Sequence, residues 1–155
     1  MRIPRIFHPE PLSADTRISL DVNAARHVGR VLRLGEGDSL ILFDGQGGEY
    51  PSVIIEVGKR ELWVESSEKV AIERESPLQI TLAQGVSRGE RMDYTIQKAV
   101  ELGVTRIAPI STERSIVNLK GDRLQKRMQH WYGIIISACE QCGRNTLPEL
   151  LPLAS

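Results

Sequence analysis

The expected fold of this chain follows from the segment ITLAQGVSRGERMDYTIQKAVELGVTRIAPISTERS, residues 80–115. Its first residues form a short apolar run of strand length. A Ser-x-x-Glu capping box begins at Ser87 and predicts the start of a helix. Apolar residues then recur at helical spacing until Gly103, where a left-handed C-terminal cap is expected. A second apolar run, residues 104–110, is ended by Pro109 and completes a strand–helix–strand unit.

Two strands joined by a helix predict a parallel pair with a right-handed crossover, the opening unit of an open α/β sheet. Such sheets bind ligands beyond the carboxyl ends of their strands. The polar groups expected at that edge suit a phosphate or a polar nucleotide, and they are Gln84, Ser87, Arg88, Glu113 and Arg114. The alternative is that the two arginines are solvated loop cations, and the segment alone leaves both interpretations open.

The amino-acid composition limits the kinds of protein that this chain can be. The 155 residues have a formal net charge of zero and a hydrophobic content of 41%, which is ordinary for a globular protein. Fifteen of the twenty basic residues are arginine, whose planar guanidinium suits phosphates and base edges better than lysine does. The N-terminus has no signal-peptide core, and no apolar run approaches the ~18 residues of a membrane span. We therefore expect a cytoplasmic protein whose two cysteines are free thiols.

Residues 1–72 differ from the rest because short strand-like segments are separated there by turn residues. Strands are expected over residues 17–20, 39–43, 50–57 and 62–72, with turns at 44–48 and 58–60. One helix, residues 23–34, interrupts them, with Asn23 as its N-cap. This pattern predicts a small antiparallel barrel. The polar segment 73–77 ends in proline and is expected to link the barrel to a second domain, residues 78–155.

The helix expected at residues 23–34 carries a basic face. Arg26, Arg30 and Arg33 fall at i, i+4 and i+7 with no interleaved acid. The opposite, apolar face comprises Val28, Val31 and Leu32. Such a stripe is typical of a surface that meets a phosphate backbone, although a solvated helix face is the common alternative. Residues of the N-terminal arm and of the helix that could extend the stripe are Arg2, Arg5, His8 and His27.

A second long helix is expected from Asp122 to about Cys142, stopped by Gly143. Its buried stripe at helical spacing comprises Leu124, Met128, Trp131, Ile135, Ala138 and Cys142. One more strand is expected near residues 149–151. Three strands and two helices would make an unfinished α/β domain, so we expect the sequence to be cut short.

Several short motifs invite other interpretations. Cys139-x-x-Cys142 lies at a helix C-terminus, unlike a redox pair, and it lacks two further zinc ligands, so we predict buried structural thiols and no metal. The glycine-rich residues 44–48 open no helix and are predicted to be a hairpin turn. Ser87 has no nucleophile-elbow sequence around it. Residues 140–144 end the long helix with an acid, an amide and a guanidinium, and they are either a site or a charged helix end.

Together these segments resemble one family. In the first part the resemblance rests on Arg2-Ile3-Pro4-Arg5-Ile6-Phe7 and His27-Val28-Gly29-Arg30-Val31-Leu32-Arg33. In the second part it rests on Ser87-Arg88-Gly89-Glu90-Arg91-Met92, Gln97-Lys98-Ala99-Val100-Glu101-Leu102-Gly103-Val104, Pro109, Glu113-Arg114 and Ala138-Cys139-Glu140-Gln141-Cys142-Gly143-Arg144. The family is RsmE, bacterial methyltransferases that place a methyl group on N3 of a uridine in small-subunit (16S) ribosomal RNA.

The resemblance implies a two-domain α+β protein. Residues 1–72 would form a small antiparallel PUA-like β-barrel that binds RNA, followed by the first part of a SPOUT α/β domain of the trefoil-knot type. That domain would hold S-adenosylmethionine at a homodimer interface. The family's Gly-Pro-Glu-Gly-Gly cofactor loop does not occur in this sequence, so the cofactor site is expected beyond Ser155, and no general base can be assigned.

The expected partner is 16S ribosomal RNA or the small ribosomal subunit. The residues expected to contact it are Arg2, Arg5, His27, Arg30, Arg33, Arg88, Arg114 and Arg144. The alternative function is a non-catalytic RNA-binding module, or a decayed fragment of the enzyme. An unrelated small α/β hydrolase is disfavoured because the sequence contains no nucleophile constellation.

Overall fold

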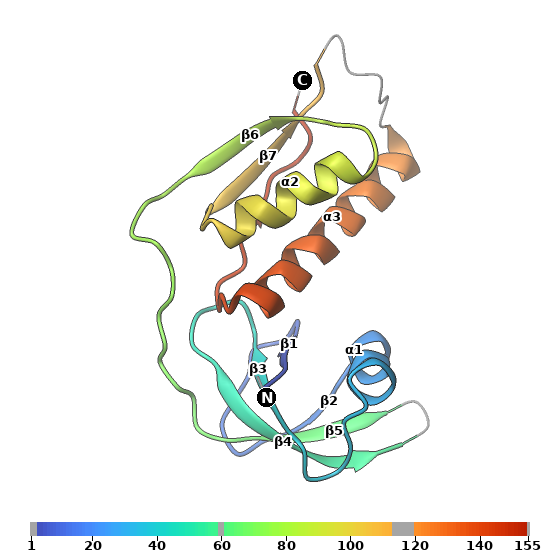
Figure 1. Ribbon diagram of the computed structural model, residues 1–155, viewed down its shortest axis with the longest axis vertical. Coiled ribbons are helices and arrows are strands. Elements are labelled where there is room, and N and C mark those ends of the chain that lie inside the picture. Colours follow the sequence, from blue (N-terminus) through green and yellow to red (C-terminus); the bar gives the residue numbers. More distant parts are fainter. Residues whose placement is uncertain (1–2, 59–60, 113–119, 155) are drawn as a thin grey trace. The chain divides into compact units, whose positions relative to one another are not determined.

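The structure is a computed structural model that describes residues 3–58, 61–112 and 120–154. The chain divides into two compact units, Met1–Arg74 (unit 1) and Glu75–Ser155 (unit 2). In Figure 1 the colours run from blue to green through unit 1 and from green to red through unit 2. The boundary between the units falls inside residues 73–77.

Unit 1 contains a five-stranded sheet in the order β1-β3-β4-β5-β2. The strands are β1 (Arg5–Phe7), β2 (Arg17–Ser19), β3 (Ser39–Phe43), β4 (Tyr50–Val57) and β5 (Leu62–Ser66). The pairs β3–β4, β4–β5 and β5–β2 are antiparallel, whereas β1 runs parallel to β3. The prediction of a purely antiparallel sheet is therefore wrong at β1. No hairpin joins β1 to β3, and the long connection between them permits parallel pairing.

The core of unit 1 comes from the alternation of side chains along the strands. The inward residues include Leu40, Leu42, Ile54, Leu62 and Val64, which are almost completely buried. Three residues of the helical segment or just after it pack against this core, namely Ala24, Ala25 and Leu34. The first helix is thus held to the sheet by small apolar contacts, which leaves its longer side chains outside.

The turn at residues 44–48 is a hairpin turn, as predicted. It joins the antiparallel strands β3 and β4, and Gly45, Gly47 and Gly48 all have positive φ angles. At Gly48 a Cβ atom would lie 3.1 Å from the carbonyl oxygen of Val70 and 2.4 Å from the Lys69 side chain. Both the backbone conformation and the close approach therefore require glycine at this position.

The strand β5 is shorter than the predicted strand of residues 62–72. It ends at Ser66, whose hydroxyl donates to the Ser13 carbonyl at 2.7 Å and accepts the Thr16 amide at 3.2 Å. Beyond it, Val70 makes only an isolated bridge with Glu49. The regular pairing of β5 with β4 thus ends at Ser66, and it resumes only as the single bridge at Val70.

Unit 2 has the strand–helix–strand order that the sequence predicts. Its elements are β6 (Thr81–Gly85), α2 (Glu90–Glu101), β7 (Arg106–Ile110), α3 (Gly121–Cys142) and β8 (Glu149–Leu150). The three strands are parallel, in the order β6-β7-β8. The two helices α2 and α3 lie side by side (Figure 1). Pro109 was expected to end its strand, but it lies within β7 opposite Gln84.

The helix ends in unit 2 are set by glycine. Gly89, with φ 60°, is the N-cap of α2, and no side chain caps this helix. The capping box predicted at Ser87 is therefore wrong, because the chain turns into the helix only after Gly89. At the other end, Gly103 with φ 91° confirms the predicted left-handed stop. Gly143, with φ 93°, confirms the predicted end of α3.

The core of unit 2 lies between the helices and the sheet. The buried side chains include Met92, Ile96 and Val100 of α2, Ile107 of β7, and Trp131, Ile135, Ala138 and Cys139 of α3. The stripe on α3 thus ends at Cys139, and Leu124 and Met128 are only half-buried. Cys142 is exposed, so the prediction of two buried thiols is wrong for it. Its spacing puts it on the face of Trp131 and Ile135, but it is the last residue of α3, and this end of the face is not covered by the described residues of unit 2.

Candidate nucleic-acid interface

The candidate interface begins at the helix of unit 1, α1 (Val22–Arg26). The carboxylate of Asp21 accepts the amides of Asn23 and Ala24 at 2.8 and 3.1 Å. Asp21 is therefore the N-cap, and the prediction of Asn23 is wrong by two residues. The cap fixes where the helix starts and hence which residues it exposes.

The helix continues as a π-helical segment, His27–Val31. Its widened turn is closed by the Leu32 amide, which donates to the His27 carbonyl at 2.9 Å. A π-turn contains one more residue than an α-turn and is frequent at functional sites. The residues that follow it are rotated away from the phase of an ideal α-helix. The predicted stripe assumed an unbroken 3.6-residue period, so this feature was not anticipated.

This rotation changes the predicted basic stripe. Arg33 lies beyond the helix with φ 57°, a conformation that non-glycine residues adopt rarely. The predicted alignment of Arg33 with the two preceding arginines is therefore wrong. Val31, predicted to face the core, is exposed, whereas Val28 is fully buried. The basic side chains themselves are all exposed, and we call them the cationic segment: Arg26, His27, Arg30 and Arg33.

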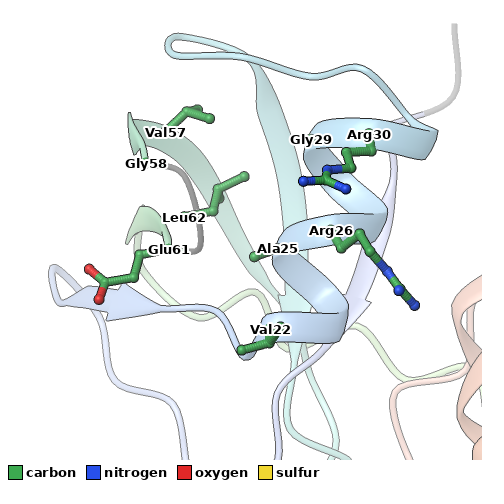
Figure 2. Close-up of a pocket in the computed structure, with 9 residues that line it drawn as sticks. All are labelled: Val22, Ala25, Arg26, Gly29, Arg30, Val57, Gly58, Glu61 and Leu62. Atoms are coloured by element: carbon green, nitrogen blue, oxygen red, sulfur yellow. The ribbon is translucent and has the colours of Figure 1, made fainter.

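A pocket of about 480 Å³ lies between this helix and the β4–β5 hairpin (Figure 2). It is lined by Val22, Ala25, Arg26, Gly29, Arg30, Val57, Gly58, Glu61 and Leu62. In Figure 2 the side chain of Arg30 extends toward the hairpin, and that of Arg26 points away from it. The carboxylate of Glu61 is turned away from the helix. The group that faces the opening from the helix is therefore a guanidinium.

Arg5, predicted to bind RNA, has a structural role in unit 1. Its Nη1 donates to Glu49 Oε2 at 2.5 Å, and its side chain is 5% exposed. The guanidinium lies 4.8 Å from the ring centre of Phe43. Arg74 donates to the same carboxylate oxygen at 2.8 Å, and this hydrogen bond raises the pKa of Arg74. Burial in this arrangement removes Arg5 from the surface and corrects its predicted RNA contact.

His8, considered as an extension of the stripe, is half-buried. Burial lowers the pKa of His8, and the nearby carboxylates Glu10, Asp21 and Asp44 act in the opposite direction. Desolvation is the largest effect, so the imidazole favours its neutral form and adds little positive charge at neutral pH. Arg2, also predicted to contact RNA, lies outside the described residues.

Arg144, the other buried arginine, holds unit 2 together. Its guanidinium contacts both oxygens of the Glu75 carboxylate, at distances of 2.5 to 3.1 Å. Its Nη1 also donates to the carbonyls of Val100 and Val104, each at 2.9 Å. The residue is 5% exposed. The expected RNA contact of Arg144 is therefore corrected to a structural clamp at the C-terminal end of α2.

The predicted cluster at the carboxyl ends of β6 and β7 is partly present. The Gly85 and Ile110 backbones pair there, and Arg88 is exposed in the loop before α2. The Gln84 amide donates to the neighbouring Gly85 carbonyl at 2.9 Å. Glu113 and Arg114 lie outside the described residues. Of the predicted group, Arg88 is thus the cation that this edge presents among the described residues.

A polar groove between α2 and α3 was not anticipated from the sequence. His130 Nε2 lies 2.8 Å from Asp93 Oδ2. The second carboxylate oxygen, Oδ1, is buried and has no hydrogen-bond partner among the described residues. Tyr94 and Gln141 are among the residues that line the same groove of about 440 Å³. The pair joins α2 to α3, and its two residues are 37 positions apart in sequence, a separation at which no local spacing signals contact.

Two further properties bear on function. Among residues 3–58, 61–112 and 120–154, no three histidine, cysteine or acidic side chains converge as a metal site would require. The same described part of the chain has no helix long and apolar enough to cross a membrane.

Each of the two units matches a known protein family. Residues 74–155 match the family described as RNA methyltransferase domain, and residues 20–65 match the RNA methyltransferase PUA domain. A ribosomal RNA small subunit methyltransferase E from Buchnera aphidicola (from Schizaphis graminum) is 37% identical over 149 residues, which cover 96% of this chain and 61% of the relative.

The similar solved structures are methyltransferases as well. Ribosomal RNA small subunit methyltransferase E from Neisseria gonorrhoeae, bound to S-adenosyl methionine, is 44% identical with a TM-score of 0.94, over 99% of this chain and 63% of that one. A putative methyltransferase from Legionella pneumophila, in complex with the same cofactor, is 42% identical with a TM-score of 0.96, over 100% of this chain and 64% of that one. This chain therefore spans less than two thirds of each of these relatives, and it belongs to the RsmE family of ribosomal RNA small-subunit methyltransferases.

Proposed function

We propose that this chain is part of an enzyme that methylates N3 of a uridine in 16S ribosomal RNA, with S-adenosylmethionine as methyl donor. The observation that carries the proposal is the likeness over nearly the whole chain to a methyltransferase of this family that was solved with the cofactor. The exposed cationic segment in unit 1 supports an RNA substrate, because guanidinium groups bind phosphates.

In this proposal unit 1 is an RNA-binding PUA-like domain and unit 2 is the first part of a knotted SPOUT domain. The family matches to residues 20–65 and 74–155 support this division. The working form would be a cytoplasmic homodimer. The cofactor contacts would lie in the part of the relatives that this chain does not cover.

Methyl transfer to N3 of a uridine determines what the RNA-binding residues would have to do. S-adenosylmethionine would supply an electrophilic methyl group on a sulfonium sulfur. The uridine must lose its N3 proton and be held with N3 in line with that methyl group, which requires the base to leave its stack. The described residues can orient the RNA but offer no group that we assign as the base.

The proposed RNA contacts are the exposed basic side chains that were predicted: His27, Arg30, Arg33 and Arg88. Arg30, Arg33 and Arg88 are placed to contact phosphate groups, because guanidinium groups donate hydrogen bonds to phosphate oxygens. The buried arginines Arg5 and Arg144 are excluded from this set by their ion pairs.

The RNA-binding part is tested by the salt dependence of affinity. Replacing Arg30 and Arg33 with alanine should weaken binding to a 16S ribosomal RNA fragment and lower the log–log salt slope by about one per lost phosphate contact. The matched control replaces Arg123 and Lys126, two exposed cations of α3. The salt slope of this control variant should stay close to the wild-type slope. Equal affinity for the Arg30/Arg33 variant and the wild type would remove the cationic segment from the interface.

The catalytic part is tested with a chimera of residues 1–155 followed by the remaining part of the Neisseria relative. Incubated with S-adenosylmethionine and small ribosomal subunits, it should yield N3-methyluridine in mass spectra of the digested RNA. Residues 1–155 alone should yield none and should bind the cofactor weakly in calorimetric titration. A chimera that methylates another base or no base would contradict the proposed reaction, and strong cofactor binding by the 155-residue chain would contradict the proposed position of the cofactor site.

A further inference from the structure

Gly29, in the π-helical segment of unit 1, is not explained by the fold. Its φ angle is not among the positive ones, so the backbone conformation does not require glycine. Among the described residues outside its own helix, no atom lies within 4 Å of a Cβ atom built on it, so close packing against them does not require glycine either. In a helix, glycine is less favourable than alanine by roughly 0.5–1 kcal/mol. This glycine leaves space beside the helix, on the side of the pocket.

That space belongs to the pocket shown in Figure 2. Gly29 forms part of its wall, and the hairpin residues Val57 and Leu62 form another. Two valines at this pocket are unusually exposed for apolar residues, Val22 at 68% and Val57 at 43%. The volume of about 480 Å³ lies in the range of about 300–1,000 Å³ that is typical of small-ligand sites. The pocket is thus a recess with aliphatic walls that the chain leaves open to solvent.

The charge at the pocket selects the kind of ligand. Arg30 extends toward the hairpin, and the carboxylate of Glu61 is turned away from the helix (Figure 2). A guanidinium plane beside aliphatic side chains suits a flat, partly apolar ring that is attached to an anion. A nucleobase with its phosphate has this combination of groups. Arg26, which points away from the pocket, is placed to contact a neighbouring phosphate.

We infer that this pocket receives the base of one unpaired nucleotide of an RNA strand. The base lies between the Gly29 wall and the β4–β5 hairpin, and Arg30 stacks on it or bonds its phosphate. Bases of a duplex are covered by their neighbours and cannot enter a recess, so the site selects single-stranded or looped RNA. This inference rests on the proposed function, because it specifies which feature of the RNA unit 1 recognises.

The glycine itself provides the experiment. The substitution Gly29→Leu fills the recess from a position where a Cβ atom meets none of the described residues outside the helix, so unit 1 should stay folded. The matched control is Gly133→Leu, since Gly133 is an exposed glycine of α3 whose Cβ would also meet no atom. Affinity of the 155-residue chain is measured for labelled single-stranded oligouridylate, oligocytidylate and oligoadenylate of eight nucleotides, and for a duplex of equal length.

The Gly29→Leu variant should bind the tightest single strand at least about tenfold more weakly than the wild type, since stacking of one base contributes to affinity at this level. Gly133→Leu should bind like the wild type, and duplex binding should change in neither variant. In the wild type, titration with the matching nucleoside monophosphate should shift the methyl NMR signals of Val57 and Leu62. If the monophosphate binds as tightly as the oligonucleotide in this titration, a free nucleotide is the ligand and the assignment to an RNA strand is overturned.

Different results would overturn the base-binding pocket and the proposed RNA-binding role of unit 1. If Gly29→Leu binds single strands like the wild type, the pocket is overturned while the RNA-binding role of unit 1 stands. If the wild-type chain binds no RNA at all, both are overturned. If Gly29→Leu unfolds unit 1, the NMR titration of the wild type decides, and unshifted Val57 and Leu62 methyl signals would overturn the pocket.

Discussion

The clamp formed by Arg144 gives a prediction whose size follows from its contacts. Replacing Arg144 with alanine removes the guanidinium that contacts Glu75 and the carbonyls of Val100 and Val104. The Glu75 side chain is only 17% exposed, so its charge is left largely buried. Breaking a buried ion pair in this way typically destabilises a protein by about 3–5 kcal/mol, a large share of the roughly 5–15 kcal/mol that stabilises a domain.

The chain contains a reporter for each unit, because Trp63 lies in unit 1 and Trp131 in unit 2. With 5-fluorotryptophan at both positions, ¹⁹F NMR during urea unfolding follows the units separately. At a urea m-value of about 1.5 kcal/mol/M, the midpoint reported by Trp131 should fall by roughly 2–3 M.

Two comparisons make this prediction specific. Replacing the exposed Arg106 with alanine should change the midpoint little, since exposed substitutions usually alter stability by under about 0.5 kcal/mol. A double variant, Arg144→Met with Glu75→Met, should regain part of the loss because both charges of the pair are then removed together. An Arg144→Ala variant that unfolds like the wild type but binds RNA more weakly would refute the clamp and restore the RNA contact first predicted from the sequence.

Three further predictions concern unit 1, and the Trp63 signal follows each. Glu49→Gln should destabilise unit 1 by about 3 kcal/mol, because Arg5 then keeps its buried charge without the carboxylate; an unchanged midpoint would contradict this. Asp21→Ala should cost about 1 kcal/mol through loss of the helix cap, whereas Asp21→Asn, which can still cap, should cost clearly less. Since burial lowers the pKa of His8, the unfolded state binds its proton more readily, and stability should fall as the pH drops from above about 6.5 through the lowered folded value. His8→Gln should flatten that part of the pH profile, and an identical profile in the variant would rule out His8 as its source.

Patterns that are local in sequence predicted the fold well. The β6–α2–β7 unit, the long helix α3 and the glycine stops at Gly103 and Gly143 were all predicted from periodicity and turn chemistry. These features depend on residues within a few positions of one another. The helix starts were predicted less well, since a capping sequence at Ser87 competes with a glycine at position 89 that can adopt φ 60°.

The candidate site was predicted less well, because it depends on partners that are distant in sequence. Arg5 is bound by Glu49, 44 residues away, and Arg144 by Glu75, 69 residues away. Neither partner is visible in a local pattern, so both arginines looked like free surface cations. The π-helical turn likewise has no sequence signature of its own, and it displaced Arg33 from the stripe that a regular helix would have made.

The hydrogen bonds that join the segment before β2 to the end of β5 also constrain how the chain can be synthesised. Thr16 and Ser66 are 50 residues apart, and among the described residues β5 is the strand with which β2 pairs. At translation rates of roughly 5–20 residues per second, β2 leaves the ribosome roughly 3–10 s before its partner strand is complete. During that interval its backbone is unpaired, so unit 1 closes only after residue 66 has emerged. Pulse proteolysis of stalled nascent chains should therefore find β2 accessible in every chain that stops short of β5.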